Sequence, residues 1–288
     1  YCLETTIICN GKSIHIQFFS SREISQKFMQ NAITWFYFIT LWLKSTCKKP
    51  LVCKIYLTPF KKTIDANILT PKYVNSGMTI SDCSSSTEII IFRREEWLKV
   101  LMHETFHNLN LDFSSFNLSF IQSKFTSMFN IDSTFLIYES YCETWAIILY
   151  NVWYCANHPK QNINHLLVKE RLHSLKQTKL ILHNMGLTYQ DLINNHNTDR
   201  YKERTNVFCY YILKMLLLYN YPAFILWCNQ HNRKVLEFKK TKKNIQLFSQ
   251  YVETIYDNPD LLSDLIKIKA TGKSLKMSAL ISKTKDSH

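Results

Sequence analysis

The chain has 288 residues, of which 46% are hydrophobic, and this excludes an intrinsically disordered protein and suffices for one large domain or two modest ones. Its formal net charge of +13 favours an acidic partner, whether nucleic acid, an anionic membrane surface or an acidic polypeptide, although scattered lysines serve solubility equally well. Nine cysteines, an odd number with no C-x-x-C pair, exclude a fully paired disulfide framework and a cysteine zinc knuckle, so we expect an intracellular, reducing compartment such as the cytoplasm.

The first part of the chain alternates polar and apolar residues in the manner of β-strands. Residues 5–9 and 13–19 flank Asn10-Gly11, the preferred pair for a two-residue hairpin turn. A β-hairpin is therefore predicted here. Ser21 is expected to cap a long helix over residues 23–45, whose apolar positions recur with helical spacing.

Strands continue to residue 92, and the periodicity then becomes helical. The predicted strands cover residues 51–57, 74–80 and 88–92, the last two joined by a polar loop. The predicted helices cover residues 94–109, 133–153, 164–184, 188–194, 205–219, 222–231, 242–257 and 260–268. Strands followed by helices indicate an α+β fold, with an N-terminal mixed sheet and long helix and a mostly helical C-terminal part.

This pattern predicts a β-rich subdomain over residues 1–92 and a helical subdomain over residues 93–269. Residues 270–288 are rich in Lys and Ser, so we expect a basic, mobile tail. No transmembrane segment is expected, because one apolar run, 32–43, is too short and the other, 210–227, is interrupted by polar residues and a proline. No secretory signal is visible, and a first residue of Tyr leaves room for a segment upstream.

The motif His103-Glu104-Thr105-Phe106-His107 carries the most specific chemistry in the chain. Histidines four residues apart share one face of a helix, at a separation that allows both imidazoles to bind one zinc ion. Glu104 projects about 100° away from His103 and can reach a water at the open coordination position without being a ligand. The competing interpretation is a chance match in a buried helix, where histidines need other partners.

A catalytic zinc site takes three protein ligands, so a third must come from farther along the chain. The best segment is the apolar helix around Glu139 and Glu143, two carboxylates that face the same way and are costly to bury without a cation. We prefer Glu143 as the ligand, with Glu139 orienting a histidine from behind; the reverse assignment remains open.

Two weaker possibilities and one competing interpretation accompany this assignment. Asp132 and Asp112 are weaker ligand candidates, and Asp112 also suits the role of an acceptor for a ligand histidine. The competing interpretation is that both glutamates pair with lysines or arginines at a helix surface.

An HExxH motif followed by a glutamate on a later helix resembles the gluzincin class of zinc metallopeptidases. In that class the third ligand often opens a Glu-x-x-Ala sequence, which residues 143–146 match, or precedes an acid by four residues, which Glu139 matches. The resemblance implies a zincin-like fold, a Zn²⁺ cofactor, a water nucleophile and an edge strand beside the cleft, either 74–80 or 88–92, that pairs with an extended polypeptide substrate.

Longer stretches of the chain are similar to uncharacterised metallopeptidases of large DNA viruses. They are VNSGMT, EIIIFRREEWLKVLMHETFHNLNLDF, YESYCETWA and TNVFCYYI, between Val74 and Ile212. This resemblance implies a viral protein that acts in the host cytoplasm or the virion. Neither end of the chain belongs to the stretches that carry this resemblance.

Together these features predict a zinc metallopeptidase, in which Glu104 acts as general base and Tyr211 or Tyr210 donates to the oxyanion. One alternative is a non-catalytic basic protein of a virion or bound to nucleic acid, with a structural or degenerate zinc site. Hydrolysis of a non-peptide amide is another. The sequence does not choose a substrate, an endo- or exopeptidase mode, or an oligomeric state.

Overall fold

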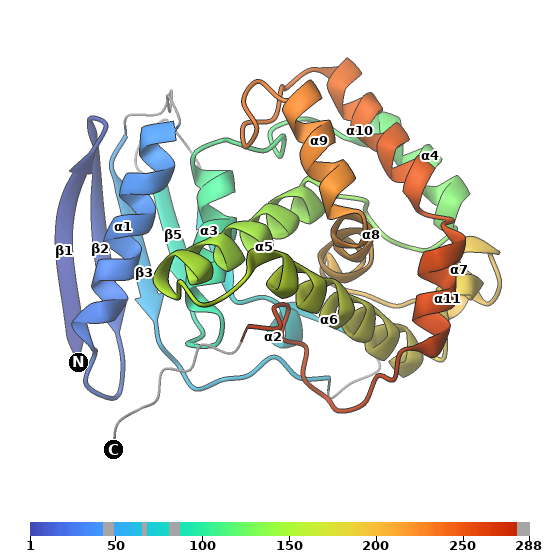
Figure 1. The fold of residues 1–288 in the computed structure, drawn as a ribbon, viewed down its shortest axis with the longest axis horizontal. Coiled ribbons are helices and arrows are strands. Elements are labelled where there is room, and N and C mark those ends of the chain that lie inside the picture. The colour runs from blue at the N-terminus through green and yellow to red at the C-terminus, as the bar shows by residue number, and fades with distance from the viewer. Residues whose placement is uncertain (43–48, 65–67, 81–86, 281–288) are drawn as a thin grey trace.

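The computed structural model describes residues 1–42, 49–64, 68–80 and 87–280. Its described part combines one five-stranded mixed sheet with eleven α-helices, which confirms the predicted α+β class (Figure 1). The sheet lies at one end of the molecule and the helical body at the other, and one continuous hydrophobic core runs through both.

The predicted hairpin consists of β1 (Cys2–Cys9) and β2 (Lys12–Phe19), paired antiparallel from Cys9 opposite Lys12. Both turn residues have a positive φ, 49° at Asn10 and 77° at Gly11. Two consecutive residues in this region form the turn whose twist matches that of a hairpin, and Asn-Gly is the pair that adopts it at least cost.

The remaining strands extend the sheet in the order β1-β2-β3-β5-β4. β3 (Leu51–Tyr56) and β5 (Thr87–Ile91) run parallel to β2, whereas β4 (Gly77–Ile80) runs antiparallel to β5 at the edge. The strand predicted over residues 74–80 is shorter than expected, because α2 (Pro71–Val74) takes its first residue and Asn75 and Ser76 connect the helix to the strand. Most of the predicted loop after it, residues 81–86, lies outside the described residues.

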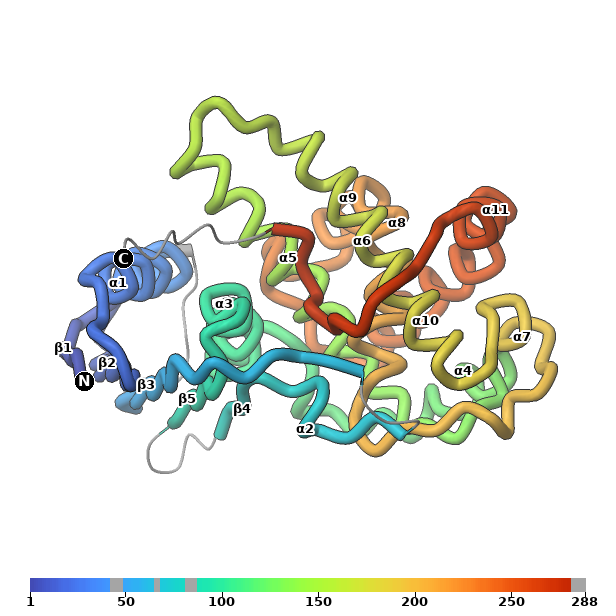
Figure 2. Tube along the Cα trace, turned by 90° about the horizontal axis from the view of Figure 1, so that it is seen from below, coloured from blue at the N-terminus to red at the C-terminus, as the bar shows by residue number. Residues whose placement is uncertain are grey.

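Two helices pack on the same face of the sheet (Figure 2). They are α1 (Gln26–Trp42), which covers the hairpin, and α3 (Trp97–Asn108), which lies over β4 and β5. The indole of Trp35 on α1 donates a buried hydrogen bond of 3.1 Å to Thr105 on α3, which joins the two helices. The sheet therefore supports the HExxH helix directly.

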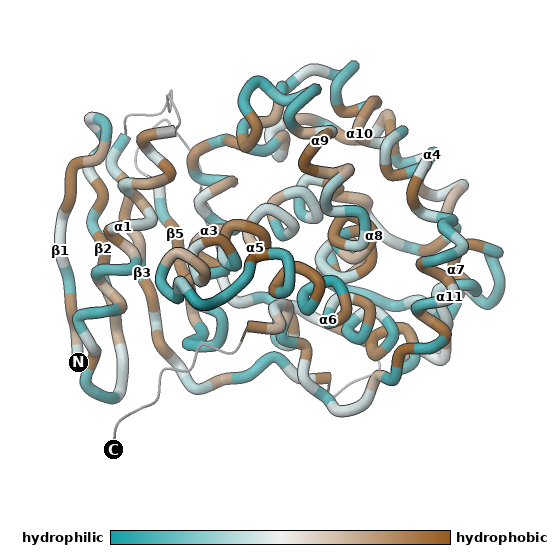
Figure 3. The backbone as a smooth tube through the Cα atoms, in the orientation of Figure 1, coloured by the Kyte–Doolittle hydropathy of each residue, from teal (hydrophilic) through white to brown (hydrophobic). Residues whose placement is uncertain are grey.

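The other helices form the body around α5 (Ile137–Asn157), which is buried through its first four turns. They are α4 (Ser119–Phe129), α6 (Ile163–Asn184), α7 (Tyr189–Ile193), α8 (Lys214–Tyr219), α9 (Tyr221–His231), α10 (Lys242–Ile255) and α11 (Pro259–Lys267). At the periphery, α10 and α11 alternate hydrophilic and hydrophobic stretches, as helices with one solvent face do (Figure 3).

Two details of the helical body differ from the prediction. The helix α4 was not expected, because its Ser, Thr and Phe residues have modest helix propensity, and its burial against the core decides its structure. The helix expected over residues 205–219 contains a π-helical segment, Phe208–Leu213, before α8. A π-helix shifts the side chains that follow it around the axis, and such segments are frequent at functional sites.

Among the described residues, no single helix combines the length and the apolar composition that crossing a membrane requires. The segments Phe208–Tyr219 and Tyr221–His231 meet that criterion only as a pair, and they are bent by 92° where they join.

The segment 273–280, here called the C-terminal strap, lies in the predicted tail and packs against the body of the protein. The amides of Met277 and Ser278 donate to the carboxylate of Glu96 at 3.1 and 2.6 Å, and the amide of Ala279 donates to Glu170 at 2.8 Å. Buried carboxylates thus replace the water that these amides would otherwise need. Residues 281–288 lie outside the described part.

Candidate metal centre

The two motif histidines project from one side of α3 towards α5. Their Nε2 atoms lie 3.1 Å apart, as expected for residues one turn apart on the same face. The exposed fraction of the His103 side chain is 7% and that of His107 is 13%, so both rings are shielded from bulk water.

Glu139, in the first turn of α5, completes a triangle of donor atoms with the two rings. Its Oε2 atom lies 3.2 Å from Nε2 of His103 and 3.3 Å from Nε2 of His107. Ligands held 2.0–2.1 Å from a tetrahedral zinc ion are about 3.3–3.4 Å apart. The three donors therefore have the mutual spacing of a tetrahedral metal site with one position left open, and they form one of the metal-compatible groups of the described chain.

The opposite nitrogens of both rings face carboxylates. Nδ1 of His107 is hydrogen-bonded to Asp112, which follows α3 and is fully buried. Nδ1 of His103 lies 2.9 Å from Oε2 of Glu143, an ion-pair distance, although the ring is not aligned for a linear hydrogen bond.

These carboxylates favour the tautomer with the proton on Nδ1, which leaves a lone pair on each Nε2 atom. Two lone pairs and a carboxylate oxygen then converge within 3.3 Å, an arrangement that positive charge stabilises, whether a metal ion or protons on the rings supply it. The chemistry of the donor set therefore fits a divalent metal.

Glu143 thus occupies a different place from the one preferred in the sequence analysis. Its Oε1 atom accepts from Nζ of Lys99 at 2.5 Å, and both side chains are only 2% exposed. One turn of α5 separates Glu143 from Glu139, so the crossing of the helices brings Glu139 to both Nε2 atoms and Glu143 to the back of His103 and to Lys99. The geometry favours the alternative ligand assignment, Glu139.

The electrostatics of the three groups agree with this placement. Burial by itself would raise the pKa of Glu139, but the imidazoles of His107 and His103 outweigh burial and lower it to about 2. Burial would lower the pKa of His103, yet its bonds with Glu139 and Glu143 raise it overall. The raised pKa values of both rings favour their protonated forms, which supply positive charge to the carboxylates.

Glu104 faces β4 rather than the three donors. The hydroxyl of Thr79 donates to its Oε2 atom at 2.7 Å and to its main-chain oxygen at 3.1 Å. A Cβ on Gly77 would lie 2.8 Å from Val100 and 2.9 Å from Oε1 of Glu104, so glycine permits this close approach of strand and helix. The edge strand β4 and the HExxH helix α3 are therefore in contact at the carboxylate of Glu104.

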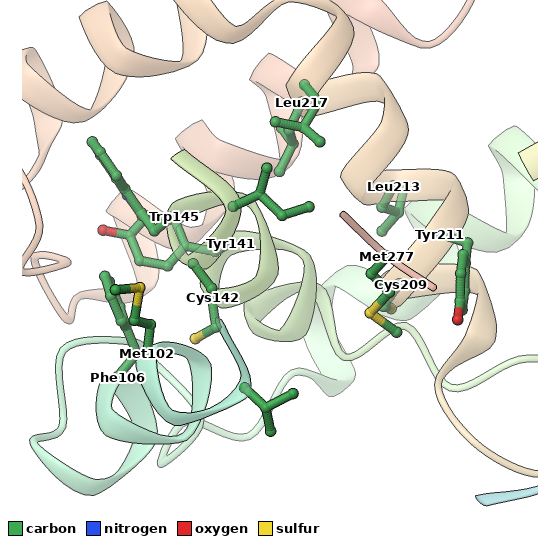
Figure 4. Packing of buried hydrophobic residues seen from close by; sticks show 14 of the residues in the cluster. Met102, Phe106, Tyr141, Cys142, Trp145, Cys209, Tyr211, Leu213, Leu217 and Met277 are labelled. Carbon is green, nitrogen blue, oxygen red and sulfur yellow. The ribbon is translucent and has the colours of Figure 1, made fainter. Parts of the chain in front are cut away.

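The two tyrosines proposed as oxyanion donors lie differently. Tyr210 is partly exposed, its ring centre is 6.0 Å from that of His103, and it lines the same cavity as Gly77 and Glu104. Tyr211 is fully buried and donates to the carbonyl of Leu275 at 2.7 Å. Figure 4 shows the Tyr211 ring at the right of the view, well apart from Cys142 and Phe106 towards the left.

Other candidates are a turn residue and two residues that sequence reasoning passed over. Asp132 is exposed in the loop before α5. Tyr138 packs edge-on against His107, with ring centres 5.9 Å apart. Lys99 was missed, although a lysine one turn before His103 in an otherwise apolar stretch was a usable signal, because such a charge needs a buried partner.

Cys142 belongs to a second group of potential metal ligands in the described chain, with His107 and Asp112. Its thiol lies 3.5 Å from Asp112, and burial raises its pKa well above the ordinary value. A protonated thiol is a weak donor to Asp112 rather than a metal ligand. Asp112 and Cys142 therefore contact the Nδ1 side of the His107 ring, opposite its Nε2 atom.

Searches of protein-family models, of curated proteins and of solved structures give no match for this chain. The site contains a buried triangle formed by His103, His107 and Glu139. The carboxylate of Glu104 lies on the same helix as the histidines and contacts the edge strand β4 at Thr79 and Gly77.

Proposed function

We propose that this protein is a zinc-dependent metallopeptidase with a zincin-like arrangement of sheet, HExxH helix and ligand helix. Its metal ligands are His103, His107 and Glu139. The observation that carries the proposal is the triangle of Nε2, Nε2 and Oε2 atoms, 3.1–3.3 Å apart, with each ring's Nδ1 atom turned to a carboxylate. Bound zinc supplies Lewis acidity and lowers the pKa of water to about 7.

Glu104 takes the role of general base. It neighbours a ligand in sequence but points to β4, and the hydroxyl of Thr79 fixes one of its oxygens at 2.7 Å. That contact leaves the other oxygen to accept a proton from the attacking water and pass it to the leaving amine. Gly77 keeps the space beside this second oxygen open.

Tyr210 is the better oxyanion donor of the two tyrosines. Burial, followed by the nearby carboxylates of Glu139 and Glu104, raises the pKa of its phenol well above the ordinary value. The phenol therefore keeps its proton at neutral pH and can donate to a developing negative charge. Tyr211 uses its hydroxyl in the bond to Leu275 and is proposed only as a packing residue.

The substrate class is an extended polypeptide. Within the described sheet β4 is an edge strand, paired only with β5, and it contacts Glu104 through Gly77 and Thr79. A peptide added to this edge would run beside the metal centre with its backbone held by strand pairing. Met78 and Ile80 are about half exposed, at 49% and 47%, and offer apolar contacts for its side chains.

The test is metal content and peptide cleavage measured on the same preparations. Wild type should carry one zinc ion per chain and cleave members of a quenched-fluorescence peptide library. Glu104→Gln should keep its zinc and lose activity by about 10²–10⁴-fold, the usual contribution of a general base. His107→Ala should lose both.

The matched control is Glu253→Gln, the same chemical change on α10, where Glu253 pairs with Lys124 at 2.6 Å. Its activity should equal that of wild type. Cleavage that survives in Glu104→Gln would refute its role as base. Wild type that binds no zinc and instead binds nucleic acid in a salt-sensitive way would favour the non-catalytic alternative.

A further inference from the structure

Two buried lysines line the small cavity beside the proposed base, and they have different partners. Lys62 and Lys99 are each 1% exposed, and the cavity has a volume of about 30 Å³. The ammonium of Lys62 pairs with Glu96 at 3.2 Å, whereas that of Lys99 pairs with Glu143 at 2.5 Å. The second pair continues to a motif histidine, because Oε2 of Glu143 lies 2.9 Å from Nδ1 of His103.

Lys99 lies one turn before His103 on α3, and its ammonium is held from two sides. Glu143 on α5 accepts from it, and Sδ of Met277 in the C-terminal strap lies 3.5 Å away. Burial by itself would lower the pKa of Lys99, but the carboxylate of Glu143, followed by that of Glu96, outweighs burial and raises it. The lysine therefore stays charged at neutral pH.

The carboxylate of Glu143 connects this cation to an imidazole. Each of its oxygens has a separate partner, Nζ of Lys99 at Oε1 and Nδ1 of His103 at Oε2. With Oε1 fixed, the second oxygen faces the ring nitrogen opposite the Nε2 atom of the donor triangle. Without the ammonium, Oε1 would lose this partner and the carboxylate would be free to rotate away from the ring.

We propose that Lys99 is a positioning residue of the metal centre, which fixes the carboxylate of Glu143 and through it the orientation and tautomer of the His103 ring. This inference rests on the proposed zinc site. Removing a group that orients a ligand histidine usually weakens metal binding by about 10–100-fold. Charge alone predicts the opposite sign, because removing a cation near a divalent metal favours metal binding.

A double-mutant cycle on zinc affinity tests this chain of contacts. Lys99→Met removes the charge and should weaken zinc binding by about 10–100-fold, as Glu143→Gln should. The double variant should bind zinc no more weakly than Glu143→Gln alone, because Lys99 acts through Glu143. Lys99→Arg keeps a charged donor and should lose clearly less affinity than Lys99→Met. Competition with a chromophoric chelator at constant pH and ionic strength measures each affinity.

Lys62→Met is the matched control. It makes the same change in an equally buried lysine of the same cavity, but that lysine pairs with Glu96, which binds amides of the C-terminal strap. Both variants should lower the urea midpoint of unfolding, since each leaves a buried carboxylate without its cation. Zinc affinity should change by less than about threefold in Lys62→Met. If Lys99→Met does not fold, Lys99→Gln, which keeps a neutral donor, replaces it in the cycle.

Ring signals of the metal-free protein separate this inference from the peptidase proposal. In nitrogen NMR spectra at one pH, Lys99→Met should shift the Nδ1 resonance of His103 and leave that of the exposed His165 unchanged. This shift would support the positioning role even if wild type bound no zinc, a result that would refute the peptidase. An unshifted His103 signal, additive losses in the double variant, tighter zinc binding by Lys99→Met or an equal loss in Lys62→Met would each overturn the role of Lys99.

Discussion

Glu139 and Glu143 have the same side chain, lie one turn apart on α5 and face the same helix, yet they meet opposite sides of an imidazole. Glu139 reaches the Nε2 side of both rings, whereas Glu143 reaches Nδ1 of His103 and the ammonium of Lys99. The Lys99 charge and the His103 ring hold the pKa of Glu143 far below its ordinary value despite burial, so this carboxylate stays charged behind the ring.

Metal affinity should therefore respond differently to the two isosteric changes. Glu139→Gln removes a charged ligand and should abolish stoichiometric zinc. Glu143→Gln leaves the three donors in place and should weaken binding by about 10–100-fold, the usual effect of changing a group that orients a ligand. Zinc content after dialysis and competition with a chromophoric chelator measure both. Zinc kept by Glu139→Gln and lost by Glu143→Gln would return the ligand role to Glu143.

At the scale of elements, the contact between α3 and β4 decides where the proposed base can point. The strand approaches so closely that any side chain at position 77 would overlap Val100 and the carboxylate of Glu104. Thr79, two residues on and on the same side of the strand, supplies the hydrogen bond that fixes this carboxylate. The edge strand therefore positions the carboxylate of Glu104, and in the proposed function the same strand would hold the substrate.

Gly77→Ala should reduce catalysis while leaving the metal bound. The new Cβ would lie 2.9 Å from Oε1 of Glu104 and must displace either that oxygen or Val100. We expect kcat to fall by about tenfold or more, as misplaced catalytic groups do, with the zinc content unchanged. Steady-state kinetics and metal analysis of the same sample test this. Ser76→Ala, at the neighbouring position, is the control, and equal losses in both variants would contradict a specific role for Gly77.

At the scale of the whole molecule, buried charges connect the sheet, the helical body and the C-terminal strap. Glu96 holds the strap amides and Lys62, and Glu170 on α6 holds Ser278 and Ala279. The side chains of Lys62 and Glu96 form a buried ion pair, and each is 1% exposed. Removing one member of such a pair leaves an uncompensated charge, so the stability of the fold depends on their ionisation.

The stability of metal-free protein should pass through a maximum in mildly acidic solution. Glu139 and Glu96 have pKa values lowered to about 2, so they contribute stability above the unfolded value of about 4.3 that is lost as pH falls towards 2. His103 and His107 have raised pKa values, so their contribution is complete below about 6.5 and is lost as pH rises through the folded values.

Urea unfolding of EDTA-treated protein at pH 3, 5.5 and 7.5 measures this profile. The free energy of unfolding should be greatest at pH 5.5. Added zinc competes with protons for the imidazoles and should stabilise the protein most at pH 7.5. A metal-free protein that is more stable at pH 7.5 than at pH 5.5 would show that the ring protons do not compensate the carboxylates.

Local rules were sufficient for the parts of this protein in which neighbours in sequence are neighbours in space. The Asn10-Gly11 hairpin, the helical spacing of His103 and His107, and the α+β order of elements follow from turn geometry and periodicity. They were predictable because the interactions that decide them span only a few residues.

Tertiary structure decided what depends on how distant segments meet. The crossing of α3 and α5 places Glu139 rather than Glu143 at the two Nε2 atoms. The packing of the Phe208–Leu213 segment leaves Tyr210 near His103 and Tyr211 bonded to Leu275. The C-terminal strap packs against the body because Glu96 and Glu170 accept its amides. A helix pattern gives the face on which a side chain lies, but the angle and depth of packing determine which atom that side chain reaches.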